Sequence, residues 1–550
     1  MGAGRLEGQV NLSKGSARGD QGAFLELKKA KPYSSRKPRR LECASGNTYQ
    51  LSQSRTLKTL AFAGSKGVAA LGMLAIAAVL SRVFDKVDYA TYRQTLLVYQ
   101  FVGPLLGLGL PAALFYFLPG ETSRLRSVLL ENLILLGTLG GLFSLFLALG
   151  GNRLIALQFS NPELEETLLI FALYPVLFLP TTAVSAVLVV QGKVKWLLLH
   201  TLATRLARVG LVVGAVWLCA AGPAGAVGAT TISGIIVLSS GLFLMLRAVP
   251  GEKGSRPTLV GMSSQLKYAV PIGLALMLEK LAMGVDQVLV SMLCSREDFA
   301  VFSNGAMEIP FIQMITVPAT AIVLPELVAL YKSNDKKEAL LLWRRAARKV
   351  AVVLLPIGGV LFVIAPELMT VLYSEDYENS AGPLRVYLLL LPARLVFFAA
   401  IFQAASRTDL ILKRAVGTLI LNILVSYPLV SYMGFQGAAW GTVIVFWGYV
   451  FPYCLCHCSR LLETRWFKLM PYRQVGIILL LIAVTGALAA FIRGYLSLSN
   501  AFLVGAATAT IMLILLLPPL ALLFRKDLSG YWQAIQKRVS GKEQGPPAGS

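Results

Sequence analysis

The feature that most constrains this chain is a series of apolar runs of about twenty residues or more along almost its whole length. Each run is long enough to cross roughly 30 Å of hydrocarbon as a helix. Only 14% of the residues are charged, whereas a soluble domain has about 25%. The sequence therefore predicts an all-α polytopic membrane protein. Breaks at glycine, proline and charge clusters place fourteen spans at 60–84, 91–118, 126–149, 166–190, 196–219, 224–246, 265–293, 300–330, 344–365, 383–405, 409–432, 436–458, 474–496 and 500–524.

The distribution of charge orients these spans. The 51 lysines and arginines outnumber the 28 acids, a balance that in a soluble protein would suggest nucleic-acid binding. Here the basic residues gather in alternate loops: 331–349 carries seven of them, whereas 366–385 carries four acids. Basic loops stay in the cytoplasm, so both termini are predicted to be cytoplasmic, and no nucleic-acid partner is expected. Residues 1–57 lack the apolar core of a signal peptide and are predicted to form a disordered basic tail; 525–550 form a second cytoplasmic tail.

The chain repeats itself at an offset of about 210 residues. Residues 81–92 read SRVFDKVDYATY and residues 291–302 read SMLCSREDFAVF; later, 222–230 (GPAGAVGAT) is matched by 434–442 (GFQGAAWGT) at an offset of 212. Six spans separate the copies, so both halves enter from the same side and form a parallel repeat, as in transporters that rock two lobes around a central site. The predicted domains are an N-lobe at 58–247, a C-lobe at 248–460 and two further spans at 461–524.

Two elements of this repeat resemble a known family. Arg82 followed by the 88–92 turn resembles the turn after the first span of Wzx-type polysaccharide flippases, although Ala90 stands where that family usually has glycine. Asn422 with the 434–439 turn resembles their element between spans eleven and twelve. The wider superfamily also holds lipid II flippases and multidrug and toxin extruders. The resemblance, over residues 57–524, implies a flippase that moves a polyprenyl-pyrophosphate-linked oligosaccharide across the bacterial cytoplasmic (inner) membrane for polysaccharide export, alongside polysaccharide polymerase machinery.

Ionisable groups inside hydrocarbon are costly and therefore indicate function. Glu279 and Asp286 fall at i and i+7 on one face of span seven, and Lys280 lies on the neighbouring face. Asn304 and Glu308 on span eight are expected near enough to share a proton or a cation with Asp286. These four oxygen-bearing residues are the predicted ion-coupling group, for Na⁺ or H⁺, which the sequence does not separate. The alternative is a structural Glu279–Lys280 pair that fixes span seven to a neighbour.

A lipid pyrophosphate would need fixed positive charge. Arg394 has no acid within one turn of span ten and is the first candidate, since a guanidinium can bind phosphate through two hydrogen bonds. The alternative is an Arg394 paired with Glu279 or Glu308. Lys280 is the second candidate, and Lys66 the third, although it could instead extend to the cytoplasmic headgroups.

Other residues carry weaker signals. Arg82 and Arg93 are expected to be solvated loop charges. The 454–458 segment CLCHC has irregular ligand spacing, which favours palmitoylation or helix-end packing over zinc. The only histidines are His200 and His457, and no phosphate-binding loop for ATP is present. No enzyme, metal or bound cofactor is predicted.

Three alternatives to the polysaccharide flippase stay open. A lipid II flippase would handle the same pyrophosphate. A cation-coupled multidrug exporter would favour an acidic cavity, whereas the charges here are mixed. A scaffold for sugar polymerases would not depend on any intramembrane charge.

Overall fold

The computed structural model describes residues 67, 70–120, 124–249, 251, 256–306, 310–395, 398–495 and 500–525. These residues are almost entirely helical and include no β-strand, which confirms the predicted all-α class. After a first helix, Ala70–Val83, the elements of the first half are α2 (Lys86–Gly107), α3 (Leu110–Gly120), α4 (Leu125–Phe146), η2 (Leu147–Gly151), α5 (Asn152–Gln158), α6 (Glu163–Phe171), α7 (Tyr174–Phe178), η3 (Leu179–Thr182), α8 (Ala183–Val190), α9 (Val194–Leu218) and α10 (Pro223–Ala248).

The second half repeats this pattern and then adds two helices. Its elements are α11 (Leu259–Leu293), α12 (Arg296–Gly305), α13 (Pro310–Lys332), α14 (Lys336–Val363), α15 (Ala365–Tyr373), η4 (Glu375–Ser380), α16 (Ala381–Leu388), α17 (Leu391–Arg394), α18 (Phe398–Ala404), α19 (Thr408–Met433), α20 (Phe435–Val445), η5 (Phe446–Val450), α21 (Phe451–Leu461), α22 (Trp466–Leu469), α23 (Tyr472–Arg493) and α24 (Ala501–Leu523).

Within the described residues, eleven helices are long and apolar enough to cross a membrane, or twelve if the pair Glu375–Leu388 and Leu391–Ala404, bent by 47°, is one span. These cover twelve of the fourteen expected spans. The other two, 60–84 and 300–330, are described only in part, as Ala70–Val83 and as α12 with α13. The predicted tails 1–57 and 525–550 lie outside the described residues apart from Arg525.

The internal repeat is visible in how its helices begin. Asp85 caps α2 by accepting from the backbone N–H of Asp88, and Ser295, at an offset of 210, caps α12 by accepting from the N–H of Asp298. Such side-chain caps satisfy backbone donors that the first turn leaves free. Gly222 and Gly434 likewise stand directly before α10 and α20. The two copies of the sequence therefore build the same local structure at corresponding places.

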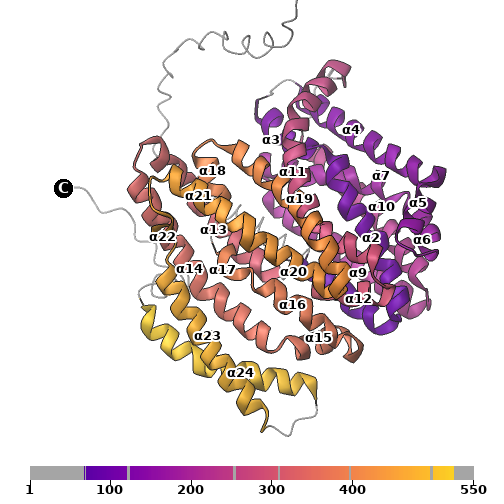
Figure 1. Cartoon of the computed structure of the whole chain (residues 1–550). Coiled ribbons are helices and arrows are strands. Elements are labelled where there is room, and N and C mark those ends of the chain that lie inside the picture. The colour runs from indigo at the N-terminus through magenta and orange to yellow at the C-terminus, as the bar shows by residue number, and fades with distance from the viewer. Residues whose placement is uncertain are drawn as a thin grey trace, which may run out of the picture. The chain divides into compact units, whose positions relative to one another are not determined.

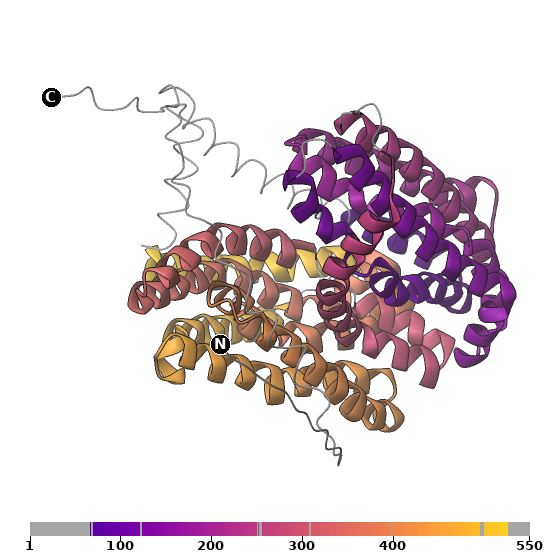
Figure 2. The same cartoon turned by 90° about the horizontal axis from the view of Figure 1, so that it is seen from above.

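Each half forms its own bundle. In the first half α9 packs on α10, α3 on α8 and α4 on α7; in the second, α19 packs on α11 and α20, and α13 on α14. Figure 2 shows the indigo to magenta helices of the first half on one side and the orange helices of the second half on the other. The last two helices, α23 and α24, pack together and against α14 and α15 (Figure 1). This arrangement is that of two pseudo-symmetric helical lobes with two added helices.

One helix contacts both bundles. The 35-residue α11 packs against α3 and α4 of the first half and against α19 and α20 of the second, with Pro271 inside it. Where α2 gives way to α3, Gly109 adopts a left-handed φ of +74°, and a Cβ there would lie 2.7 Å from the Gly273 nitrogen of α11. A Cβ on Gly273 would lie 2.2 Å from the Leu108 carbonyl carbon. Only glycine lets these two backbones approach so closely.

Candidate functional site

Asp286 lies inside the second lobe, where three helices meet. Its side chain is buried, and its carboxylate accepts hydrogen bonds from the Tyr387 hydroxyl of α16 and from the backbone N–H of Gln287 at 2.8 Å. The Thr442 hydroxyl of α20 lies 3.5 Å from the same carboxylate. A buried carboxylate is stable only when such partners replace its lost water. The sequence identified Asp286 but neither Tyr387 nor Thr442, because they come from distant spans.

Two further buried acceptors lie on α19, which packs against α11 and α20. The Asn422 amide donates to the Ala282 carbonyl of α11 at 2.8 Å, one turn before Asp286, while its own Oδ1 has no partner among the described residues. The Ser426 hydroxyl, one turn further on, is also buried without a described partner and faces Gly441, the residue before Thr442. We call Asp286, Asn422, Ser426 and Thr442 the oxygen cluster. One carboxylate with neutral oxygens is a ligand set for a hard cation.

Glu279 takes a different partner from those that the sequence offered. Its carboxylate forms an ion pair of 2.8 Å with Arg414, on the first turns of α19. Glu279 is thus paired neither with Lys280 nor with Arg394. Arg414 lies within the predicted span 409–432 but was not among the predicted site residues. Lys280 is exposed, with no hydrogen bond or ion pair in the described part of the chain.

Arg394 ends the short helix α17, beside the 47° bend of its span. Its side chain is half-buried and has no hydrogen bond or ion pair among the described residues. It lies near enough to Tyr387 to act on that hydroxyl electrostatically. The Tyr387 hydroxyl, which donates to Asp286, is thus within electrostatic range of the Arg394 charge.

Asn304 lies where the two lobes meet. Its Oδ1 accepts from the Tyr89 hydroxyl at 2.5 Å, so it joins α12 to α2, whereas Asp286 bonds within the second lobe. Its Nδ2 is buried without a partner in the described residues. Lys66 and Glu308, the remaining predicted site residues, lie outside the described residues.

Several polar contacts link the two lobes around Asn304. The Arg93 guanidinium donates to the Ser303 carbonyl at 3.0 Å and Gln94 donates to the Ser291 hydroxyl at 2.9 Å. Arg82 donates to the Val371 carbonyl. The expectation that both are solvated charges is wrong for Arg93, which is half-buried; Arg82 is exposed as expected, but it too donates to a backbone carbonyl of the other lobe. We call the set of contacts made by Arg82, Tyr89, Arg93, Gln94, Ser291, Ser303, Asn304 and Val371 the interlobe clasp.

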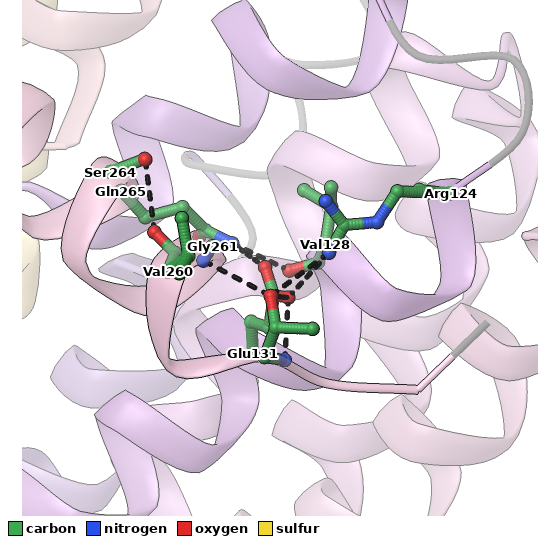
Figure 3. Close-up of polar contacts among 8 residues, drawn as sticks. Arg124, Val128, Glu131, Val260, Gly261, Ser264 and Gln265 are labelled. Atoms are coloured by element: carbon green, nitrogen blue, oxygen red, sulfur yellow. Dashed lines mark hydrogen bonds and ion pairs between the residues drawn. The ribbon is translucent and has the colours of Figure 1, made fainter.

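A second polar network lies at the end of the bundle opposite the interlobe clasp, where α4 and α11 begin. Glu131 of α4, which is 1% exposed, accepts from Arg124 at 3.0 Å and from the Thr258 backbone N–H and hydroxyl at 2.9 and 3.0 Å. Gln265 of α11 donates to it at 3.2 Å (Figure 3). A Cβ on Gly261 would lie 2.2 Å from the Glu131 carboxylate, so only glycine fits there. We call Arg124, Glu131, Thr258, Gly261 and Gln265 the Glu131 network.

The two polar regions hold opposite ends of the bundle. The interlobe clasp joins the start of α2 to the second lobe, and the Glu131 network joins the start of α11 to α4. Sequence reasoning missed the network because Glu131 falls near a predicted span end, where an acid carries no special signal. In the described residues no group of three or more His, Cys, Asp or Glu side chains could hold a metal ion.

Comparisons with known proteins agree with this architecture. Residues 58–330 match the family model described as polysaccharide biosynthesis protein, and residues 299–512 match the model described as lipid II flippase MurJ. No curated protein matches the chain.

Solved transporters share the fold. A structure of the lipid II flippase MurJ in an inward closed conformation is 15% identical and has a TM-score of 0.65, covering 86% of this chain and 99% of that one. An inward-facing multidrug resistance MATE family transporter is 18% identical with a TM-score of 0.53, covering 74% and 96%. A MOP superfamily transporter from Pyrococcus furiosus Vc1 is 20% identical with a TM-score of 0.52, covering 74% and 96%. The two family models together cover residues 58–512, and the chain has the fold of these solved flippases and transporters.

Proposed function

We propose that this protein is a flippase that moves a polyprenyl-pyrophosphate-linked oligosaccharide from the cytoplasmic to the external leaflet of the bacterial inner membrane. The observation that carries the proposal is the pair of overlapping family matches, to a polysaccharide biosynthesis protein over 58–330 and to the lipid II flippase MurJ over 299–512. Both descriptions concern the handling of carbohydrate or its lipid-linked precursor. The oligosaccharide would then pass to polysaccharide polymerase machinery.

The two polar regions suggest how access alternates. The interlobe clasp lies at the end that the charge pattern predicts to be external, and the Glu131 network lies at the end predicted to be cytoplasmic. Opening one region while the other stays closed would expose a site between the lobes to one leaflet at a time. The polar contacts of the region that opens would have to break first.

The oxygen cluster is the proposed coupling site. A Na⁺ bound there would use the two acceptors that have no described partner, on Asn422 and Ser426, together with Asp286 and Thr442. Protonation of Asp286 would serve the same purpose for H⁺. Glu279, paired with Arg414, then has a structural role, and Asn304 acts in the clasp.

Arg394 connects the cation to the cargo. A cation on the oxygen cluster would repel the Arg394 guanidinium, whereas a bound pyrophosphate would attract that guanidinium. The two ligands would therefore pull the Arg394 side chain in opposite directions. Lys280 and Lys66 are proposed as further contacts of the pyrophosphate. The exchange of ions and cargo would reset the transport cycle.

A lipid II flippase is the second candidate, favoured by the MurJ family match and by the MurJ structure at a TM-score of 0.65. Its cargo would carry a different sugar on the same pyrophosphate group. A multidrug exporter is supported by the MATE structures through fold alone.

The test is transport in proteoliposomes that contain the full-length protein. Three cargoes are compared: a polyprenyl-pyrophosphate oligosaccharide, lipid II and a lipophilic cationic drug, each with and without Na⁺ and H⁺ gradients. Arg394→Ala is compared with Arg394→Lys and with the control Arg153→Ala, which removes an exposed arginine. We expect gradient-dependent flipping of the oligosaccharide lipid that Arg394→Ala reduces at least tenfold and Arg153→Ala leaves unchanged. Transport of the drug alone, or of none of the three, would contradict the proposal.

A further inference from the structure

Two arginines lie in the middle of a membrane-spanning helix and take no part in the site described above. Arg205 and Arg208 are one turn apart on α9, which runs from Val194 to Leu218. At 1.5 Å per residue, each lies about 15 Å or more from either end of the helix. Charged side chains at this depth are rare, and they normally face a protein interior, a water-filled cavity or a ligand.

Arg208 is held in place by neutral groups only. Its Nε donates to the Ser233 hydroxyl of α10 at 3.0 Å, and its Nη2 donates to the Tyr174 hydroxyl of α7 at 2.9 Å. The guanidinium carbon also lies 5.5 Å from the centre of the Tyr174 ring and 5.4 Å from that of Phe178. These contacts orient the guanidinium into the first lobe but do not neutralise its charge. They also show that Arg208 does not extend to the membrane surface.

Arg205 lies on the same side of the helix. A Cβ built on Gly72 would lie 3.6 Å from its Cβ, so it faces the first helix of the chain. Its guanidinium interacts electrostatically with Arg208 and Tyr174, and no acid is among the groups that interact with it in this way. Among the described residues it forms no hydrogen bond and no ion pair.

The first lobe therefore holds two adjacent positive charges at mid-depth with no carboxylate in contact among the described residues. Two like charges one turn apart repel each other, and the low dielectric of the interior strengthens this repulsion. An anion that bridges both guanidinium groups would remove the repulsion and satisfy their free N–H groups. Guanidinium groups match the geometry of phosphate oxygens, each through two parallel hydrogen bonds.

We propose that Arg205 and Arg208 form a second anion site, inside the first lobe, that binds a phosphate-type oxyanion. Arg208 is positioned in advance by Ser233 and Tyr174, and Arg205 supplies the free donors. The oxyanion is either the pyrophosphate of the lipid-linked cargo or free inorganic pyrophosphate. Only the first of these sources rests on the proposed function; the site itself does not.

The test measures binding of inorganic pyrophosphate to the purified full-length protein in nanodiscs by calorimetry. Arg205→Gln, Arg208→Gln and the double variant are compared with Arg205→Lys, which keeps the charge, and with Arg153→Gln, which removes an exposed arginine. We expect each glutamine variant to weaken binding at least tenfold and Arg205→Lys to weaken it less. Because Arg205 has no described partner, Arg205→Gln is expected to leave folding intact, which size-exclusion chromatography checks.

A second arm identifies the source of the anion. Competition by a polyprenyl-pyrophosphate without sugar would assign the site to the cargo headgroup, and absence of competition would assign it to the free anion. Unchanged pyrophosphate affinity in the double variant would overturn the site. Arginine-dependent binding of pyrophosphate with no transport of any lipid cargo would overturn the proposed function and leave the site standing.

Discussion

The Glu131 network gives a prediction whose magnitude follows from its contacts. Glu131→Ala removes an acceptor that holds the start of α11 through the Thr258 backbone N–H, the Thr258 hydroxyl and the Gln265 amide. Hydrogen bonds to a charged group contribute about 1.5–3 kcal/mol each, and a buried donor left without a partner costs about 1–3 kcal/mol. Gln265 keeps a second acceptor, the Val128 carbonyl at 3.0 Å, so the Thr258 N–H is the main donor lost.

The ion pair with Arg124 adds little to this magnitude. Arg124 is 42% exposed, so water screens its charge and the pair contributes about 0–1 kcal/mol. The sum for Glu131→Ala is about 3 kcal/mol. Since each 1.4 kcal/mol is a factor of ten, the start of α11 should separate from α4 about 100 times more often.

Hydrogen exchange measures this opening directly. Peptides covering residues 256–268 should exchange their amide hydrogens about 100-fold faster in Glu131→Ala than in the wild type, because exchange follows local opening. Peptides from α19 should be unaffected. The matched control is Glu338→Gln, which removes an acid from an exposed pair with Arg345 and should change exchange by less than a factor of about three. An equal, small change in both variants would refute the reasoning.

Four further predictions rest on other contacts. Gly273→Ala should lower the melting temperature and slow transport, because the added Cβ would lie 2.2 Å from the carbonyl carbon of Leu108, the residue after α2. A thermal melt in detergent checks it, and an unchanged melting temperature would contradict the tight approach of the two backbones. Asp286→Asn should abolish the dependence of transport on a cation gradient while the protein still folds, since the amide keeps the size of the carboxylate; persistence of that dependence in proteoliposomes would remove Asp286 from the coupling site. An impermeant maleimide added outside intact cells should label a variant that keeps only the exposed Cys219, and should not label one that keeps only the exposed Cys456 at the opposite end. Rapid labelling of Cys456 from outside would reverse the predicted orientation. Burial raises the pKa of the Cys294 thiol to about 11, so at neutral pH little thiolate forms and a variant keeping only Cys294 should react slowly.

Much of the fold follows from the sequence because bilayer physics leaves few solutions. Long apolar runs must be helices, and the repeat at an offset of 210 predicted that the starts of α2 and α12 correspond, as their caps at Asp85 and Ser295 confirm. The bend of 47° near Arg394 and the contact of α11 with both lobes were not predictable. Both depend on contacts between helices that are distant in the sequence, which no local sequence pattern predicts.

The candidate site was harder to read because a single helix does not reveal its partners. Periodicity correctly put Glu279 and Asp286 on one face, but the first contacts Arg414 and the second contacts Tyr387. Arg205 and Arg208 lie within the predicted span 196–219, but the prediction named only Arg394, Lys280 and Lys66 as cations inside the membrane. Their depth within α9, given by counting residues from both helix ends, is the signal that would have found them.

Alternating access to a lipid-linked oligosaccharide is the proposed mechanism of this chain. The most direct measurement is the rate at which a polyprenyl-pyrophosphate oligosaccharide becomes accessible on the opposite leaflet of proteoliposomes. It compares the wild type with a protein whose interlobe clasp is closed by a short, reducible bis-methanethiosulfonate cross-link between cysteines that replace the exposed Arg82 and its hydrogen-bond partner Val371. We expect gradient-dependent transfer that stops when the cross-link forms and resumes on reduction. Transfer at the wild-type rate with the clasp cross-linked would contradict this mechanism.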